Sequence, residues 1–239
     1  MSEFWNNEIE VGYYDKIVQK GMIKKKGPRS YWHITTLLKV GNYLNDNLNH
    51  LDYACGPGTL IGNFSNSKST GVDISSKQIH YALKNYKKNG NFLAINDFNF
   101  KDYDQYFDII TVLGLIEFLN DKDVAKLIER LKFTLKDDGK IILTTPNFSG
   151  ITKILEVLQN KFGNVNYEDQ HINKFTKNKL IKLFGSNNDF ELKVEKFLNL
   201  SFLLSFLSHR IAWKTESIIN KLFNNRFGSL FIVILTKKS

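Results

Sequence analysis

Short apolar runs alternate along the chain with longer segments whose apolar residues recur every three or four positions. The short runs predict strands at residues 50–54, 68–73, 91–96, 107–113, 140–145, 190–200 and 230–236. The run Phe107–Leu113 is almost continuously apolar, as expected for a strand that is buried on both faces. The longer segments, 76–89 and 123–135, have the spacing of helices. This alternation predicts a parallel sheet that is covered by helices.

Two stretches lie outside this alternation: the N-terminal part, which has a helical pattern with aromatic anchors, and a long helical insertion before the last strand. Neither internal repeats nor a Pro- or Ser-rich linker divides the chain. We therefore expect a single domain of 239 residues. Its successive parts are N-terminal helices (1–45), a core (48–147), the insertion with a strand near 190–200 (147–226) and the last strand (228–236).

Composition excludes several classes of protein. Hydrophobic residues make up 42% of the chain and charged residues 24%, with only 3 prolines, which argues against a disordered or collagen-like chain. The 1 cysteine rules out an intramolecular disulfide and a zinc site built from several thiolates, and we predict no metal site. The first ten residues carry three glutamates and no apolar run, and nowhere do 18 uncharged apolar residues follow one another. We therefore expect no signal peptide, no spanning helix and a cytoplasmic location.

The net charge of +9 is concentrated outside the middle of the chain. Residues 51–150 carry 12 basic and 12 acidic side chains, whereas residues 151–239 carry 14 and 7. The block Lys16–Arg29 alone holds six positive side chains and no acid. Such a block suits a face that meets phosphate, an anionic lipid surface or nucleic acid, and it is equally typical of a solvated surface in a lysine-rich protein.

A glycine-containing turn follows the first strand, where residues 51–58 read Leu-Asp-Tyr-Ala-Cys-Gly-Pro-Gly. Glycines there permit positive φ angles and let a ligand lie against the backbone. A dinucleotide-binding turn has the pattern G-x-G-x-x-G, but here only Gly56 and Gly58 fit, because Ile61 stands in place of the third glycine. Ala54 stands where a further glycine could precede them. The turn therefore disfavours a pyrophosphate, and with it a NAD-dependent dehydrogenase, and suits a smaller nucleoside ligand.

An acid closes the second strand, in the sequence Gly71-Val72-Asp73. Asp73 lies about 20 residues beyond Asp52 of the first strand, the separation at which an acid binds both ribose hydroxyls in doubly wound nucleotide folds. Asp73 could instead cap the helix that starts near Ser76. Together with the glycine turn, the spacing favours the ribose.

Several motifs, in order, resemble those of the class I S-adenosylmethionine-dependent methyltransferases. They are Leu51–Gly58, Val72-Asp73, Asn96-Asp97, Phe107–Asp121 and Leu135–Asn147. More narrowly, they are similar to the small-molecule branch, which includes quinone-biosynthesis and sugar or lipid methyltransferases. The resemblance implies an α/β, Rossmann-like fold: a seven-stranded, mostly parallel sheet with helices on both faces and a final antiparallel strand. It also implies S-adenosyl-L-methionine as cofactor, the core as its binding part, the N-terminal helices as a lid and the insertion as the acceptor side.

The resemblance assigns the cofactor site position by position. Asp52 would hold the methionine ammonium, and Asp73 would take the ribose hydroxyls. Asp97 would accept a hydrogen bond from the adenine amino group. The other cofactor-binding positions would contribute backbone or packing surface, and they are Ala54, Gly56, Gly58, Ile74, Phe98, Leu113 and Gly114.

The acceptor side offers few candidates for a base. Residues 115–121 match a family stretch that usually carries Glu-His, and Phe118 stands where that histidine is common. His171 precedes the pair Phe175-Thr176, as a histidine often precedes a Phe-Thr pair in an acceptor-side segment of the family. The resemblance therefore makes His171 the candidate catalytic residue, and the alternative is a loop histidine bonded to local backbone.

The resemblance is weakest in the lid and the insertion, so it leaves the acceptor open. The stretch 197–213 is strongly apolar yet broken by serines, His209 and Arg210, and it is too short to span a membrane. It either packs as core or lid, or rests in a bilayer interface and contacts a lipid-like substrate. We expect a small-molecule, glycan or lipid-like acceptor methylated at oxygen, with peripheral membrane contact through 197–213 as a second hypothesis.

Two alternative functions stay open. The basic balance suits a nucleic-acid methyltransferase, but residues 113–116, Leu-Gly-Leu-Ile, lack an Asn-Pro-Pro-Tyr-like tetrad after the fourth strand, so nucleic acid is disfavoured as a partner. The departure at Phe118 leaves room for a catalytically silent, cofactor-binding partner protein. The sequence predicts no oligomeric state.

Overall fold

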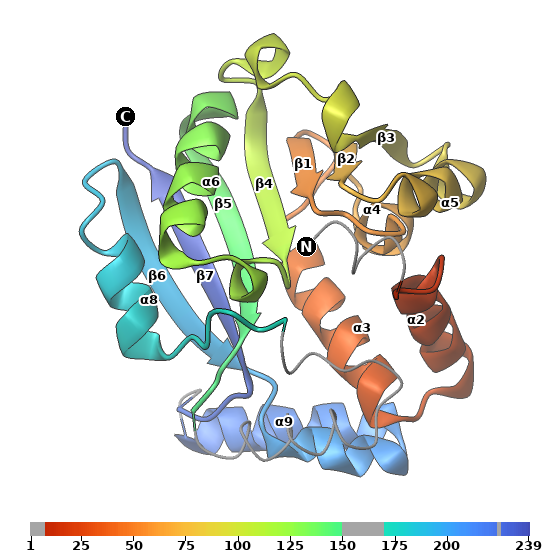
Figure 1. Cartoon of the computed structure of the whole chain (residues 1–239). Coiled ribbons are helices and arrows are strands. Elements are labelled where there is room, and N and C mark those ends of the chain that lie inside the picture. The colour runs from red at the N-terminus through yellow and green to blue at the C-terminus, as the bar shows by residue number, and fades with distance from the viewer. Residues whose placement is uncertain (1–7, 150–169, 224–225) are drawn as a thin grey trace.

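A seven-stranded sheet in the order β3-β2-β1-β4-β5-β7-β6 forms the centre of the computed structural model, which describes residues 8–149, 170–223 and 226–239 (Figure 1). The strands are β1 Asn49–Tyr53, β2 Lys68–Asp73, β3 Gly90–Ala94, β4 Phe107–Leu113, β5 Leu135–Pro146, β6 Phe190–Phe197 and β7 Leu230–Lys237. Only β7 runs against its neighbours, and all other pairs are parallel. The expected Rossmann-like sheet with a final antiparallel strand is confirmed.

Helices cover both faces of this sheet (Figure 1). The α-helices are α2 Tyr13–Lys24, α3 Pro28–Gly41, α4 Thr59–Phe64, α5 Ser76–Tyr86, α6 Asp121–Thr134, α8 Lys177–Phe184 and α9 His209–Phe223. Short 3₁₀ turns are η1 Ile95–Asp97, η2 Phe100–Tyr103, η3 Ile116–Phe118 and η4 Leu200–Phe206. The part of the predicted insertion at 150–169 lies outside the described residues. Within the described ranges, no helix is both long and apolar enough to cross a bilayer.

Neighbouring residues of the central strands serve opposite faces, because side chains alternate along a strand. Ile110 of β4 and Ile141 of β5 pack with α6 and α8 in one core cluster. Ile109 and Ile142, one position away, pack with α3, η4 and α9 in a second cluster. Both faces are therefore apolar, which explains why residues 107–113 show little polar alternation.

Most strand bounds lie within two residues of the sequence prediction, and two differ by more. β5 begins at Leu135 rather than at residue 140, because Leu135 is fully buried and pairs with Phe107 of β4 ahead of a register shift. β6 ends at Phe197 rather than near residue 200, because Leu198 adopts a left-handed φ of 59°. Asn199 then caps η4, its side chain accepting a hydrogen bond from the Ser201 N–H.

The N-terminal helices are fastened to α5 by buried polar contacts. Asp15 of α2 is buried, and its carboxylate accepts hydrogen bonds from the hydroxyls of Tyr81 (2.9 Å) and Tyr86 (2.7 Å). The Gly12 N–H, just before α2, donates to Gln78 Oε1 at 3.0 Å. Because α5 follows the carboxyl end of β2, these contacts hold the N-terminal segment beside the edge of the sheet where ligands bind in this class of fold.

Candidate active site

The chain leaves β1 through a turn that contains three left-handed residues. Ala54, Gly56 and Gly58 have φ angles of 64°, 54° and 77°. Two backbone hydrogen bonds fix the turn, from the Cys55 N–H to the Val72 carbonyl (3.0 Å) and from the Gly58 N–H to the Cys55 carbonyl (3.1 Å). Glycine adopts this conformation readily, whereas the side chain of Ala54 makes it strained. The turn therefore requires a positive φ at residue 54, where this chain has alanine and not glycine.

Gly56 and Gly58 lack side chains for different reasons. A Cβ on Gly58 would lie 2.7 Å from the Phe92 ring and 2.9 Å from Ala82, so the bare backbone there allows β3 and α5 to pack closely. A Cβ on Gly56 would meet no atom of the described chain within 4 Å. Gly56 thus faces open space at the carboxyl end of β1 and leaves room for a ligand against the backbone.

Asp73 ends β2 and lies against this turn. Its Oδ2 accepts a hydrogen bond from the Gly56 N–H and its Oδ1 one from the Ser75 N–H, both at 2.8 Å. Burial raises the pKa of this carboxyl, although the backbone hydrogen bonds oppose the shift. A carboxylate offers about four acceptor sites, so at least one stays available for a hydroxyl donor beside the backbone N–H groups of Gly56, Ile74 and Ser75. Ser75 occupies the N-cap position of α5 without a side-chain cap hydrogen bond, and the bond from its N–H is the contact of Asp73 with the start of that helix.

Asp52 lies inside β1, with a line of buried polar groups behind it. Its Oδ1 accepts a hydrogen bond from the Thr111 hydroxyl at 2.7 Å. The Nε2 of His50 lies 2.8 Å from the same hydroxyl, and the Nδ1 of His50 lies 2.9 Å from the Ser69 hydroxyl. Burial raises the pKa of Asp52 to about 7, with a smaller contribution from the charge of Asp73. Ionising this buried carboxyl is costly, and a cation placed beside it would stabilise the ionised form. The position therefore suits an ammonium ligand.

The positions expected around adenine are partly exposed. Ile74 follows β2 with 46% of its surface exposed, so its side chain is free to cover a planar ring. Asp97 is exposed at the end of η1. Phe98, by contrast, is buried, and its ring stacks on Tyr103 with the centroids 4.8 Å apart. Phe98 therefore packs in the core next to Asp97, and its ring does not face the solvent.

The loop after β4 contains a buried acid that the sequence analysis did not single out. Glu117 is 4% exposed, and burial raises its pKa to about 7. No hydrogen bond of good geometry reaches its Oε2 in the described chain, and the Thr145 hydroxyl, which makes none either, lies close enough to oppose the rise in the pKa of Glu117. Gly114, which follows Leu113 with a φ of 62°, is so close that a Cβ there would lie 3.6 Å from Glu117 Oε1. An unpartnered carboxylate oxygen thus lies beside the predicted methionine end of the site.

His171 lies next to the same loop. Its ring packs against the rings of Phe118 and Phe148, with centroids 5.1 and 5.3 Å away. The segment is held in place by Asn173, whose N–H donates to the Glu117 carbonyl at 2.9 Å. The imidazole therefore comes to lie beside Phe118, the position at which the resembled family often carries its own histidine.

The N-terminal segment reaches this place as well. Ile9, Tyr13 and Tyr14 pack with Phe118 in a small apolar cluster. The ring of Tyr14 also lies edge-on to that of His33, with the centroids 5.3 Å apart. The structure thus brings described parts of the predicted lid and of the insertion together around one aromatic residue after β4.

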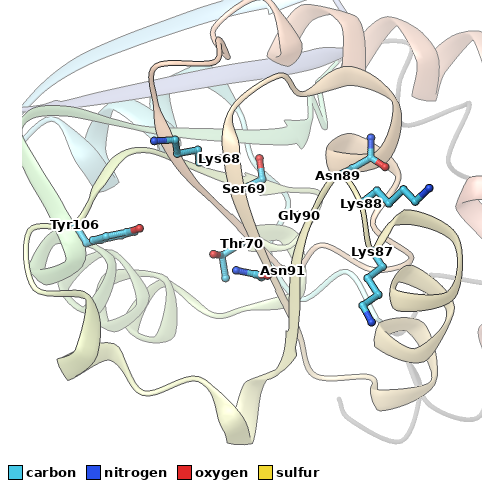
Figure 2. Close-up of a pocket in the computed structure, with 9 residues that line it drawn as sticks. All are labelled: Lys68, Ser69, Thr70, Lys87, Lys88, Asn89, Gly90, Asn91 and Tyr106. Atoms are coloured by element: carbon cyan, nitrogen blue, oxygen red, sulfur yellow. The ribbon is translucent and has the colours of Figure 1, made fainter.

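The hollow drawn in Figure 2 lies at the other end of the sheet. Its lining residues come from the starts of β2 and β3 and from the segments just before β3 and β4, and they are Lys68, Ser69, Thr70, Lys87, Lys88, Asn89, Gly90, Asn91 and Tyr106. The site described above gathers at the carboxyl ends of the parallel strands, where open α/β sheets bind ligands. The two places are therefore separate.

Residues 29–194 match the family described as Methyltransferase domain, and because the match spans more than half of the chain, the protein belongs to that family. No curated protein sequence matches the chain significantly. The protein is an S-adenosylmethionine-dependent methyltransferase, and the donor set at the carboxyl ends of β1 and β2 suits the ammonium and hydroxyl donors of that cofactor.

Several solved structures have a similar fold. A SAM-dependent methyltransferase from Archaeoglobus fulgidus is 19% identical with a TM-score of 0.61, over 94% of this chain and 100% of that chain. The plantazolicin methyltransferase BpumL, in complex with SAH, is 19% identical with a TM-score of 0.61, over 100% of this chain and 94% of that chain. A structure described as the complex between the Haloferax volcanii Trm112 methyltransferase activator and the putative methyltransferase is 11% identical with a TM-score of 0.59, over 97% of this chain and 100% of that chain. At these identities the likeness shows the fold alone.

Proposed function

We propose that the protein methylates an oxygen of a small or amphipathic acceptor, and that Glu117 takes the acceptor's proton. When bound, S-adenosylmethionine supplies a methyl carbon on a cationic sulfur, which keeps the electron pair as the acceptor oxygen bonds to that carbon. A hydroxyl acceptor must lose its proton in this step. After the step, the methyl group is on the acceptor oxygen, the proton is on Glu117 and the sulfur is neutral.

The observation that carries this proposal is the unpartnered Oε2 of buried Glu117. A buried acceptor without a partner is unfavourable in the free protein, and a hydroxyl donor of the substrate would satisfy it. With its pKa raised to about 7, Glu117 is also poised to accept a proton near neutral pH. An acceptor held by this carboxylate would lie next to Gly114, where the methionine end of the cofactor is expected.

The cofactor would be held by the residues that surround the glycine turn. In this proposal Asp52 pairs with the ammonium and Asp73 binds the ribose hydroxyls, while Asp97 accepts from the adenine amino group. The open backbone at Gly56 and the exposed side chain of Ile74 leave room for the ligand. Alignment of donor and acceptor, together with exclusion of water, would provide much of the rate.

The acceptor side would be mainly aromatic. Phe118, Phe148, Tyr13 and Tyr14 gather where the lid and the insertion meet, and His171 lies among them. Such a lining suits an apolar ring or chain with one hydroxyl group, as in a quinone precursor or a lipid-like molecule. His171 would orient that hydroxyl or share the proton with Glu117. In this scheme residues 1–45 and 147–226 select the acceptor, and residues 48–147 hold the cofactor.

Glu117→Gln is the variant that tests the base. The amide keeps the size of the side chain but cannot take a proton, so we expect the rate of methyl transfer to fall about 100-fold, with SAH affinity nearly unchanged. The wild-type rate should rise with pH up to about 7 and then level, and the variant should lack this step. Glu129→Gln, at an exposed glutamate of α6, is the matched control. A Glu117→Gln enzyme with the wild-type rate and pH profile would exclude Glu117 as the base.

The acceptor is tested with S-adenosylmethionine that carries a radioactive methyl group. Purified protein is incubated separately with catechols and hydroxybenzoates, with sugars, with a phospholipid extract and with RNA. Label in a catechol, sugar or lipid fraction supports the proposed acceptor class. Label in RNA alone would replace it by the nucleic-acid alternative, and cofactor binding without any transfer would favour a silent partner protein.

A further inference from the structure

Exposed apolar side chains are concentrated in one part of the molecule. Twenty large apolar residues of the described chain are exposed, and ten of them lie within residues 200–227, which comprise η4, α9 and the segment before β7. Their exposed fractions are high, reaching 65% at Phe206, 70% at Leu207 and 73% at Leu222. We call the exposed side chains of residues 200–223 and 226–227 the α9 face. Scattered apolar residues need no explanation, but the gathering of half of the exposed apolar side chains in one segment indicates a binding surface.

The exposed side of α9 is amphipathic. At the helical period of 3.6 residues per turn, Ile211, Ile218 and Leu222 fall within about 40° of one another around the axis. Lys214 and Lys221 fall along one border of this apolar stripe. The opposite side of the helix is anchored by Glu216, which is buried and accepts a hydrogen bond from the Tyr31 hydroxyl at 2.6 Å. The helix thus packs on the protein through its opposite side, and the apolar stripe faces the solvent.

A second basic segment adjoins this face. The turn between α2 and α3 is joined to η4 and α9 by two backbone hydrogen bonds, from the Gly27 N–H to the Ser205 carbonyl (2.6 Å) and from the His209 N–H to the Lys25 carbonyl (2.8 Å). This turn carries the three exposed lysines 24–26 and follows Ile23, which is 80% exposed. The C-terminal part of the basic block Lys16–Arg29 is thus next to the α9 face.

The charge of the combined surface has one sign. Between residues 197 and 229 the chain has four basic residues and one acid, and that acid is the buried Glu216. The adjoining turn at 24–29 has four basic residues and no acid. A second copy of the chain docking on the same surface would bring like charges together, which is unfavourable. An anionic bilayer offers the complementary pair of properties, negative headgroups for the lysines and an apolar layer for the stripe.

We propose that the α9 face, with the adjoining lysines 24–26, docks the protein on the surface of an anionic bilayer. The helix would lie in the plane of the headgroups, with Ile218 and Leu222 inserted and Lys214 and Lys221 at the phosphate level. Figure 1 shows α9 at the end of the molecule toward which β4, β5 and β6 point, so docking would turn that end of the sheet toward the lipid. This docking does not depend on the identity of the acceptor.

The test is co-sedimentation of the full chain with vesicles of phosphatidylcholine, with and without phosphatidylglycerol. We expect binding to the anionic vesicles only, weakened at high salt because the lysine contacts are screened. Ile218→Glu/Leu222→Glu should weaken binding about tenfold or more. Phe133→Glu/Ile181→Glu, which changes two exposed residues of α6 and α8 on the other face of the sheet, adds the same charge and should also reduce general attraction, but much less.

A fluorescent label reports the orientation independently of affinity. The single native cysteine, Cys55, is buried, so an introduced thiol can be labelled selectively. A polarity-sensitive dye on Leu222→Cys should shift to shorter wavelength with anionic vesicles, whereas the same dye on Ile181→Cys should not.

Two results would overturn the proposal. Equal vesicle binding by the two double variants, or equal dye shifts at both sites, would mean that docking does not use the α9 face. A chain that sediments as a dimer without lipid, and becomes monomeric on Ile218→Glu/Leu222→Glu, would assign the face to a second copy instead. Both double variants are at exposed positions, and unchanged SAH binding and melting temperature would establish that they are folded.

Discussion

Ala54 has the clearest conflict between a residue type and its backbone conformation, because its φ of 64° is left-handed. A left-handed L-residue costs about 1–2 kcal/mol, and glycine in its place loses about 0.4–1 kcal/mol through the greater freedom of the unfolded chain. Ala54→Gly should therefore raise the free energy of unfolding by up to about 1 kcal/mol, measured by urea denaturation. Ala82→Gly, at a buried position inside α5, should lower it by about 1 kcal/mol or more. If both variants lowered stability equally, the strain at residue 54 would be disproved.

Spacing and residue type were enough to place Gly56, Gly58 and Asp73 around one turn, because a strand, a glycine turn and a following acid are local features of the chain. Glu117 could not be found in this way. Its burial and its unpartnered oxygen depend on β5 and on the segment around Asn173, both distant in sequence. Glutamate is almost never fully buried without a partner, so a sequence reading assigns it to the surface by default. The available signal was the place of Glu117 in the family stretch 115–121, next to Phe118, which replaces the usual histidine.

At the scale of elements, periodicity predicted the strands best where both faces are apolar. The bounds of β2 and β4 agree with the prediction to the residue, and the largest differences are at the start of β5 and the end of β6. Those ends depend on pairing with Phe107 and on the left-handed Leu198, which no periodicity encodes. The docking of α2 on α5 through Asp15 is likewise a tertiary contact between polar residues, and the pattern of apolar positions cannot show it.

Asp15 makes the attachment of α2 testable. Asp15→Ala removes the acceptor for the hydroxyls of Tyr81 and Tyr86 and leaves both partly buried without it. We expect amide hydrogens of α2 to exchange about tenfold faster or more, while those of β4 keep their rates, as measured by hydrogen exchange with mass spectrometry. Asp46→Ala, at an exposed aspartate before β1, is the control and should change neither. Faster exchange throughout the protein would mean that Asp15 supports the whole fold and not the attachment of one helix.

For the whole molecule, four titratable groups make stability depend on pH in opposite directions. Burial raises the pKa of Asp52 and of Glu117 to about 7, so the folded protein holds more protons than the unfolded chain between about pH 4 and 7. These two acids therefore lower stability as pH rises through that range. Burial lowers the pKa of His50 to about 3 and that of His33 to about 4, so these histidines raise stability with pH up to about 6.5. The two trends oppose each other below about pH 6.5. Just above that pH only the acids still change stability, and they lower it.

Asp52→Asn separates the two trends and tests the cofactor contact at the same time. Asparagine removes the penalty for ionising a buried acid but still accepts the hydrogen bond from Thr111. The free variant should therefore gain stability over the wild type as pH rises, by roughly 2 kcal/mol more at about pH 8 than at about pH 5, measured by urea denaturation. Asp108→Asn is the control: burial is outweighed there by hydrogen bonds from Lys136 and the Asn49 N–H, which hold the pKa of Asp108 below its ordinary value. Its effect on stability should thus be the same at both pH values.

Addition of SAH should reverse the order of the two proteins at about pH 8. The ammonium of the ligand offsets the charge of Asp52 in the wild type, so binding should stabilise the wild type more than the Asp52→Asn variant. Below about pH 7 the wild type must first lose the proton of Asp52, so its affinity should fall about tenfold per pH unit and binding should release a proton. Calorimetric titration in buffers of different ionisation enthalpy measures that proton directly. The ammonium does not pair with Asp52 if the wild type releases no proton at about pH 6, or if the Asp52→Asn variant releases as many protons as the wild type. Asp52 would then have a structural role only.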